Sequence, residues 1–114
     1  MDTYAVSQEM NEAAAKAGQE YLDKHYDGKD WGACGFAWVT LCPRYKGNTK
    51  AGKEERKLFA QLGFEKDWTG KTYMRWNPSG LGCQNVDAKE AGARAAAKVL
   101  QAHGLQAYAG SRLD

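Results

Sequence analysis

Apolar residues near the amino terminus recur every three or four positions, which is the spacing of one face of an α-helix. This stripe consists of Val6, Met10, Ala13, Ala17 and Tyr21. The spacing predicts a helix from about Thr3 to Tyr26, and the following pair Asp27-Gly28 is typical of a helix end. A helix with one such stripe has to bury it against the rest of the chain.

Residues typical of β-strands fill the stretch from Cys34 to Cys42, which Pro43 closes. Side chains of a strand alternate between its two faces, and here both sets are largely apolar. One set is Cys34, Phe36, Trp38, Thr40 and Cys42, and the other is Ala33, Gly35, Ala37, Val39 and Leu41. We therefore expect this strand to lie centrally with cover on both sides, or to present aromatic rings to a ligand.

A second helix and a hairpin are predicted after a polar loop at residues 44–49. Leu58, Phe59 and Leu62 give the buried edge of a helix over about 50–62, and Gly63 suits its end. Two β-type segments then flank the turn residues Thr69-Gly70, which predicts a hairpin over residues 64–76.

The third helix has the clearest start signal. Asp87-x-x-Glu90 resembles a capping box, and Gly104 marks the end of the helix. Its predicted apolar face is made of small residues, which favours close packing on a sheet. This face consists of Ala88, Ala91, Ala95, Val99 and Ala102. A last strand is predicted from Leu105 to Ser111.

These elements give the order helix, then β-α-β-β-α-β, which predicts an α+β fold with the split βαβ arrangement of ferredoxin-like domains. With 114 residues we expect one domain, with an amino-terminal helix at 1–28 and a βαββαβ core at 33–112. Because large exposed apolar patches are uncommon on soluble monomers, we expect the first helix to cover the open face of the antiparallel sheet. If it packs at an edge instead, Trp38, Tyr73 and Tyr108 form an exposed surface for base stacking.

The predicted order is also that of the RNA-recognition motif, whose third strand carries a Lys/Arg-Gly-aromatic pattern. The corresponding segment here, Lys71 to Trp76, lacks that pattern. The resemblance is therefore one of topology, and topology does not assign a function.

Charge is unevenly distributed, although the net charge is only +2. Residues 1–30 hold seven acidic and three basic side chains, whereas residues 31–76 hold nine basic and four acidic ones. Such asymmetry bears on partners more than on fold. The chain has neither a long apolar run nor a basic and apolar leader, so we expect no membrane span, no secretory signal and a cytoplasmic location.

The densest basic stretch, residues 44–57, holds six Lys or Arg side chains and only two acids. On a loop that leads into a helix, such groups can contact phosphates or an acidic protein surface, and the alternative is a solvated face without a specific role. Trp68 lies in a turn-like context, where an exposed tryptophan can anchor an interface. The candidate binding residues are Arg44, Tyr45, Lys46, Lys50, Lys53, Arg56, Lys57, Trp68 and Arg75.

The three cysteines, Cys34, Cys42 and Cys83, match no zinc-binding spacing and include no CxxC pair. We expect reduced thiols and no metal or cofactor.

Residues 31–38, WGACGFAW, faintly resemble the segment around the nucleophile of papain-type proteases. Those proteases place the cysteine at a helix start, whereas Cys34 begins a predicted strand. The histidines available as a base, His25 and His103, fall at predicted helix ends, where histidine commonly caps.

The sequence therefore predicts a non-catalytic binding module that engages nucleic acid or a nucleic-acid-handling protein through the basic loop and helix with nearby aromatics. One alternative is a small protein inhibitor, of the bacteriophage-accessory type, that blocks the functional surface of a host protein. The other is a small thiol enzyme built on Cys34 or Cys83, with no predicted catalytic partner. The oligomeric state stays open.

Overall fold

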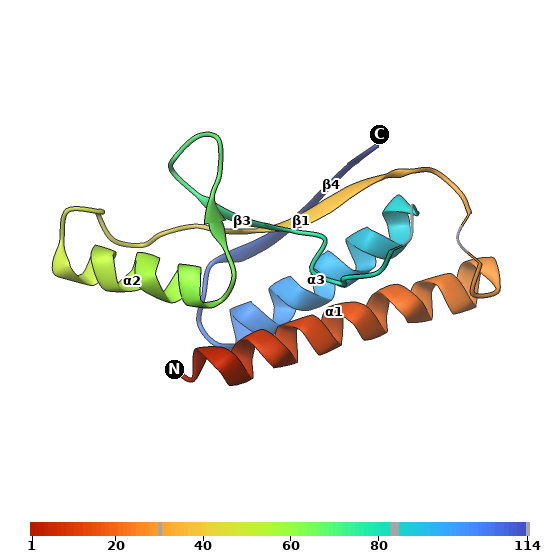
Figure 1. Ribbon diagram of the computed structural model, residues 1–114, viewed down its shortest axis with the longest axis horizontal. Helices are drawn as coiled ribbons and strands as arrows, with labels where there is room; N and C mark the ends of the chain where they lie inside the picture. The colour runs from red at the N-terminus through yellow and green to blue at the C-terminus, as the bar shows by residue number, and fades with distance from the viewer. Residues whose placement is uncertain (30, 83–84, 114) are drawn as a thin grey trace.

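Helices and strands follow one another in the predicted order, a helix and then β-α-β-β-α-β (Figure 1). The computed structural model describes residues 1–29, 31–82 and 85–113. Within them the elements are α1 (Thr3–Tyr26), β1 (Gly35–Leu41), α2 (Lys50–Gln61), β2 (Glu65–Lys66), β3 (Tyr73–Trp76), α3 (Val86–Ala102) and β4 (Ala107–Leu113). The bounds of α1 agree with the prediction, and α2 ends one residue earlier than predicted.

Capping groups set the ends of the first two helices. The Asp2 carboxylate accepts the backbone N–H of Ala5 at 3.1 Å, and Asp27 ends α1 in the left-handed conformation. The Thr49 hydroxyl accepts the backbone N–H of Gly52 at 3.0 Å and so caps α2. These side chains satisfy backbone groups that a helix end leaves without an internal partner.

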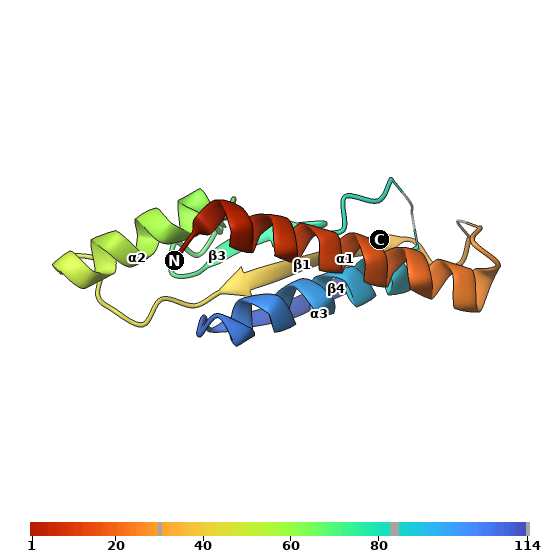
Figure 2. The same cartoon turned by 90° about the horizontal axis from the view of Figure 1, so that it is seen from below.

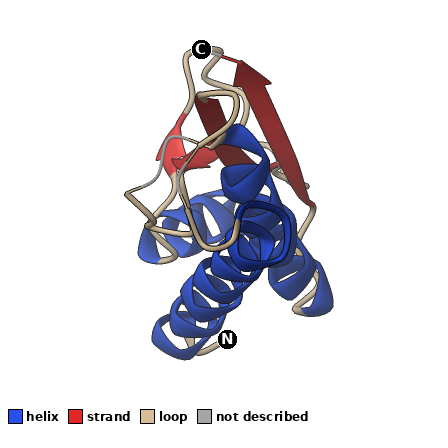
Figure 3. Ribbon diagram, turned by 90° about the vertical axis from the view of Figure 1, so that its right-hand side faces the viewer, coloured by secondary structure: helices blue, strands red, loops and turns tan. Residues whose placement is uncertain are grey.

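The four strands form one antiparallel sheet in the order β2-β3-β1-β4. β1 pairs along its whole length with β4, from Gly35 opposite Leu113 to Leu41 opposite Ala107, and it pairs with β3 on its other side. β1 is therefore a central strand, as predicted. β4 begins and ends two residues later than the predicted 105–111, because its pairing continues to the start of β1. The fold is α+β, with the helices gathered on one side of the sheet (Figure 3).

α1 packs against α3 on the helix side of the sheet, so the expectation that α1 covers the open face is wrong (Figure 2). Small residues let the two helix backbones approach closely. A Cβ atom on Gly18 would lie 3.2 Å from the carbonyl oxygen of Ala88, and one on Gly92 would lie 2.9 Å from that of Ala14. α1 therefore forms an additional layer beneath α3, and the other face of the sheet stays open.

The buried stripe of α1 differs from the predicted one beyond Met10. The stripe is Val6, Met10, Ala14, Gly18 and Leu22. The predicted Ala13, Ala17 and Tyr21 are only half-buried. The choice between these neighbouring stripes follows from the close contact with α3, which a row containing Ala14 and Gly18 permits.

The N-cap of α3 and its buried face also differ from the prediction. Its N-cap is Asn85 rather than Asp87, because the Asn85 side-chain oxygen accepts the Ala88 N–H at 2.9 Å. α3 packs against α1 on one side and against β1 and β4 on another, so it buries more than one stripe. Its buried residues are Val86, Ala88, Lys89, Gly92, Ala93, Ala96, Ala97 and Leu100. The predicted Ala91, Ala95 and Val99 are half-buried, and Ala102 is exposed.

Candidate functional site

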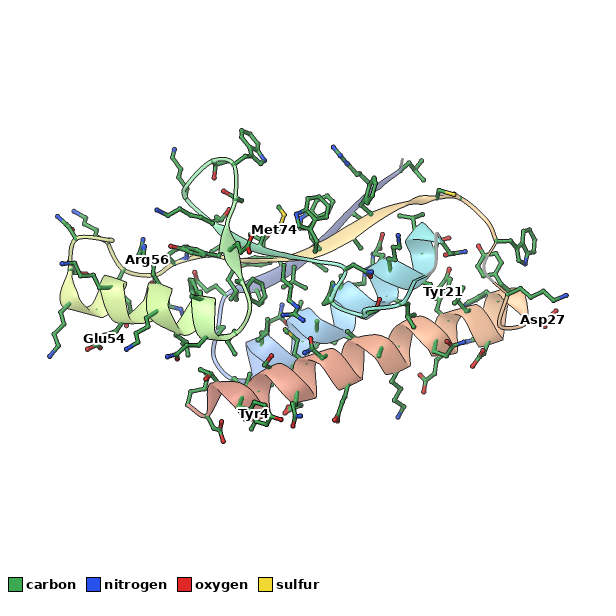
Figure 4. All side chains as sticks on the ribbon, in the orientation of Figure 1. Tyr4, Tyr21, Asp27, Glu54, Arg56 and Met74 are labelled. Carbon is green, nitrogen blue, oxygen red and sulfur yellow. The ribbon has the colours of Figure 1, made fainter. Side chains whose placement is uncertain are left out.

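The open face of the sheet carries aromatic side chains from three strands. Phe36 and Trp38 belong to β1, Trp76 to β3 and Tyr108 to β4, and these four residues form the aromatic face. Trp76 is 54% exposed and Tyr108 is 58% exposed. Figure 4 shows the side chains that rise from this side of the sheet, next to the labelled Met74. Contiguous exposed apolar surface of this kind usually marks a place where something binds.

Strand register brings the rings of Phe36, Trp38 and Trp76 together. Trp38 stands opposite Trp76 of β3, and the centroids of the two rings are 5.2 Å apart. Phe36 meets Trp76 edge to face, with centroids 6.2 Å apart and ring planes at 87°. Cross-strand neighbours of this kind stabilise one another while their outer faces stay open to a ligand.

Gly110 of β4 leaves the space that the Trp38 ring occupies. It stands opposite Trp38, and a Cβ atom on Gly110 would lie 2.7 Å from atoms of the Trp38 indole. The indole therefore lies across the β4 backbone. A glycine within a strand often marks such a close approach.

Cations flank one end of the aromatic face. The Arg112 guanidinium and the Lys89 ammonium each lie 5.7 Å from the centroid of the Phe36 ring. Lys89 is buried and donates to the carbonyl oxygen of Gly35 at 3.1 Å, whereas Arg112 is exposed. The Phe36 end of the face is thus positively charged.

Two clefts open beside Trp76. The first, of about 360 Å³, is lined by Phe36, Trp76 and Arg112. The second, of about 300 Å³, extends from Trp76 to the hairpin between β2 and β3 and is lined by Glu65, Lys66, Asp67, Trp68, Met74 and Trp76. Trp76 lines both clefts and so connects the aromatic face to the hairpin.

The hairpin carries the predicted Trp68, which is 91% exposed. Asp67 organises the turn, because its carboxylate accepts the Thr69 backbone N–H at 2.9 Å and the hydroxyl groups of Thr69 and Thr72. The hydrogen bond from the Thr69 side chain, followed by that from Thr72, lowers the pKa of the Asp67 carboxyl. The turn therefore holds Trp68 beside the second cleft.

The predicted lysines gather at a different place. Lys46, Lys50, Lys53 and Lys57 are exposed on α2 and on the loop before it, at one end of the molecule (Figure 1). Those on α2 are spaced by three and four residues, so they share one helix face. Within the described part of the chain, no ion pair joins these four lysines to an acid.

The two predicted arginines of the basic stretch bind the backbone. Arg44 donates to the carbonyl oxygen of Gly104 at 2.7 Å, and Arg56 donates to those of Tyr45 and Gly52 at 3.0 Å each. The nearly buried Glu55 carboxylate accepts the backbone N–H groups of Arg44 and Tyr45. Glu55 and Arg56 therefore fix the loop onto α2, and the Arg44 side chain ties it to Gly104 after α3. Tyr45 is half exposed in a cleft of about 480 Å³ there.

Arg75 and Tyr73 lie on the helix side of the sheet. Arg75 donates to the side-chain oxygen of Asn11 on α1 at 2.9 Å, and burial lowers the pKa of its guanidinium. Tyr73 is buried against Phe59, with ring centroids 5.3 Å apart, so the idea that it joins an exposed aromatic surface is wrong. Neither side chain belongs to the aromatic face.

The described thiols are free. Cys34 is exposed just before β1 and Cys42 is half-buried, and the predicted Cys83 lies outside the described residues. The two histidines contact other groups: the His25 ring packs on Tyr21, and His103 lies 3.4 Å from the Glu9 carboxylate. Within the described residues, no three metal-ligating side chains gather.

Comparison with models of protein families, with curated proteins and with solved structures found no match to this chain. In the described part of the chain, no helix combines the length and apolarity needed to cross a bilayer.

Proposed function

We propose that this chain is a non-catalytic binding module that holds single-stranded nucleic acid across its aromatic face. The supporting observation is the set of rings gathered on one open sheet face, two of them more than half exposed. Stacking of a base on an aromatic side chain contributes about 1–3 kcal/mol and tolerates any base. Unpaired strands offer free base faces, whereas a duplex hides them, so a single strand suits this surface.

Cations give the proposed strand its electrostatic support. The exposed Arg112 and the buried Lys89 both lie near the Phe36 ring at one end of the aromatic face. The exposed lysines of residues 46–57 lie beyond the sheet, on α2 and its preceding loop. A strand that continues from the face toward α2 brings its phosphates to these lysines, and such contacts weaken as salt rises because bound counterions are released.

A protein inhibitor that covers a partner's functional surface is the second candidate. Trp and Arg are among the residues that dominate protein–protein binding, and Trp76 and Arg112 line one cleft here. Both candidates use the same face but differ in salt dependence. Phosphate contacts lose affinity steeply with salt, whereas an interface dominated by buried apolar area does not.

We also infer the split βαβ arrangement of ferredoxin-like domains. It is supported by β3 lying between β1 and β2, and by β1 lying between β3 and β4. The two strands of each β-α-β unit are therefore separated by one strand of the other unit. α1 is an addition to that arrangement. A cytoplasmic setting, which we likewise propose, keeps the free Cys34 and Cys42 reduced.

Fluorescence anisotropy with labelled oligothymidylate and oligouridylate tests the proposed function. We expect the full chain to bind both at low salt and to lose most of that affinity between about 50 and 200 mM NaCl. Trp76→Ala removes one stacking ring and is expected to weaken binding about tenfold. Tyr4→Ala is the matched control, because Tyr4 is also an exposed aromatic residue, 71% exposed, but lies on α1.

Failure to bind either oligonucleotide at low salt would contradict the proposal, as would equal affinity of the Trp76→Ala variant and the unaltered chain. Capture of one stoichiometric protein partner by the unaltered chain but not by the Trp76→Ala variant, without oligonucleotide binding, would favour the inhibitor instead. Thermal unfolding of each variant checks that the substitution has not disrupted the fold.

A further inference from the structure

The cleft of about 360 Å³ between Phe36, Trp76 and Arg112 has the form of a receptor for one planar group. The rings of Phe36 and Trp76 stand at 87°, so they form a corner rather than a flat floor. A base that stacks on the face of one ring therefore has the other ring at its edge. The cleft is also within the size range of small-molecule sites in proteins.

Arg112 is the one charged residue among the three that line this cleft. It stands opposite Phe36 in the pairing of β1 with β4, and its guanidinium lies over the Phe36 ring. The guanidinium is a planar set of hydrogen-bond donors without an acceptor. A ring contact of this kind orients the guanidinium. The N–H groups then point outward in the plane of the guanidinium.

An arginine guanidinium can discriminate between bases. Guanine presents two adjacent acceptors, N7 and O6, to which an arginine fork donates two parallel hydrogen bonds. Adenine has a donor amino group next to N7, and cytosine also presents an amino group. Those amino groups oppose the positive charge that Arg112 and Lys89 bring to this end of the face.

We propose that the cleft between Phe36, Trp76 and Arg112 holds one base of the bound strand and prefers guanine, which Arg112 recognises through N7 and O6. This inference rests on the proposed function and adds sequence preference to it. Stacking on Trp38, Trp76 and Tyr108 then supplies binding to any strand, and Arg112 selects the base at one position.

The test uses oligothymidylates of about eleven nucleotides with one altered central base, a length typical for small single-strand binding surfaces. The central base is guanine, hypoxanthine, 7-deazaguanine, adenine or thymine. Hypoxanthine keeps N7 and O6 and lacks only the 2-amino group, whereas 7-deazaguanine lacks N7. We expect the guanine and hypoxanthine strands to bind alike, about five- to tenfold tighter than the other three.

Arg112→Lys keeps the charge and removes the planar fork. We expect this variant to bind all five strands equally, because its ammonium still attracts phosphates but no longer offers the fork that selects guanine. Arg94→Lys is the matched control, since Arg94 is an exposed arginine on α3 that pairs with Glu90. It is expected to keep the guanine preference.

The outcomes separate the two proposals. Binding of all strands without a guanine preference, equal binding of guanine and 7-deazaguanine, or a preference that survives Arg112→Lys would overturn the inference and leave the proposed function standing. Absence of binding to every strand would overturn both. Both proposals are also overturned if no strand binds and sedimentation shows a dimer that dissociates in the Trp76→Ala variant. In that case a second copy of the chain covers the aromatic face.

Discussion

The two faces of β1 show how differently one strand can use its apolar residues. Toward the helices it presents Ala37, Val39 and Leu41, which are at most 1% exposed. Toward the open side it presents the larger rings of Phe36 and Trp38, and Phe36 is 38% exposed. The smaller side chains are thus buried and a large ring is left accessible.

Close packing explains the buried face. α3 brings mainly alanine and glycine to the interior, so the layers lie close together and the sheet contributes side chains of modest size. Which side chains are buried therefore depends on how well they fit between the sheet and α3, as well as on how hydrophobic they are. The open face has no such constraint, so large rings can stand on it and stay accessible.

The largest expected effect is on the buried face. Leu41→Ala removes a fully buried side chain and leaves a cavity, so the free energy of unfolding is expected to fall by about 2–5 kcal/mol. Trp76→Ala, on the open face, is expected to lower it by less than about 1 kcal/mol. Urea unfolding followed by circular dichroism measures both. Equal losses for the two variants would contradict the difference between the faces.

Contact between α1 and α3 gives the next largest effect. A Cβ atom on Gly92 would lie 2.9 Å from the Ala14 carbonyl oxygen, so Gly92→Ala forces the helices apart and is expected to cost about 1–3 kcal/mol. Gly82→Ala is the matched control, because its Cβ would meet nothing within 4 Å. If thermal unfolding shows both variants as stable as the unaltered chain, α1 does not pack on α3 as described.

A smaller effect is expected from Gly110→Ala, which places a methyl group 2.7 Å from the Trp38 indole. The indole has to leave its place over β4, at a cost of about 1 kcal/mol in the free energy of unfolding. Oligonucleotide affinity is expected to fall severalfold, because the stacking surface changes shape. Unchanged tryptophan fluorescence and unchanged affinity would show that the Trp38 ring does not lie across β4.

The smallest effect concerns pH and the hairpin. Hydrogen bonds from Thr69 and Thr72 lower the pKa of Asp67 in the folded chain, so their stabilisation is present above the unfolded pKa of about 4 and is lost as the pH falls through the lower folded value. Below about pH 4 the turn that holds Trp68 is expected to loosen. Asp67→Asn is expected to remove that pH dependence, and amide exchange at Thr69 and Gly70 measures it.

Elements governed by local signals could be predicted from the sequence. α1 has a long helical period with Asp27-Gly28 after it, and its bounds agree with the prediction. Thr69-Gly70 likewise predicts the hairpin between β2 and β3. In both cases the deciding interactions join residues close together in the chain, so a short window contains the relevant information.

Long-range fit decided the rest. The segment before Asn77 holds two aromatic residues, Tyr73 and Trp76, on opposite faces of β3, and a slip of one residue would exchange them. Only pairing with β1 places Trp76 outside and Tyr73 inside. The position of α1 depends similarly on the fit of Gly18 against Ala88, which the sequence does not reveal because the two residues are seventy positions apart.

A nitrogen–proton correlation spectrum of the indole groups tests most directly whether the open face is the binding surface. Trp38 and Trp76 belong to that face, whereas Trp31, 62% exposed, packs on Tyr26 before β1 and serves as an internal reference. On addition of oligothymidylate, we expect the Trp38 and Trp76 indole signals to shift while that of Trp31 stays in place. Shifts confined to the amides of Lys50 to Lys57, with both face indoles unmoved, would contradict it.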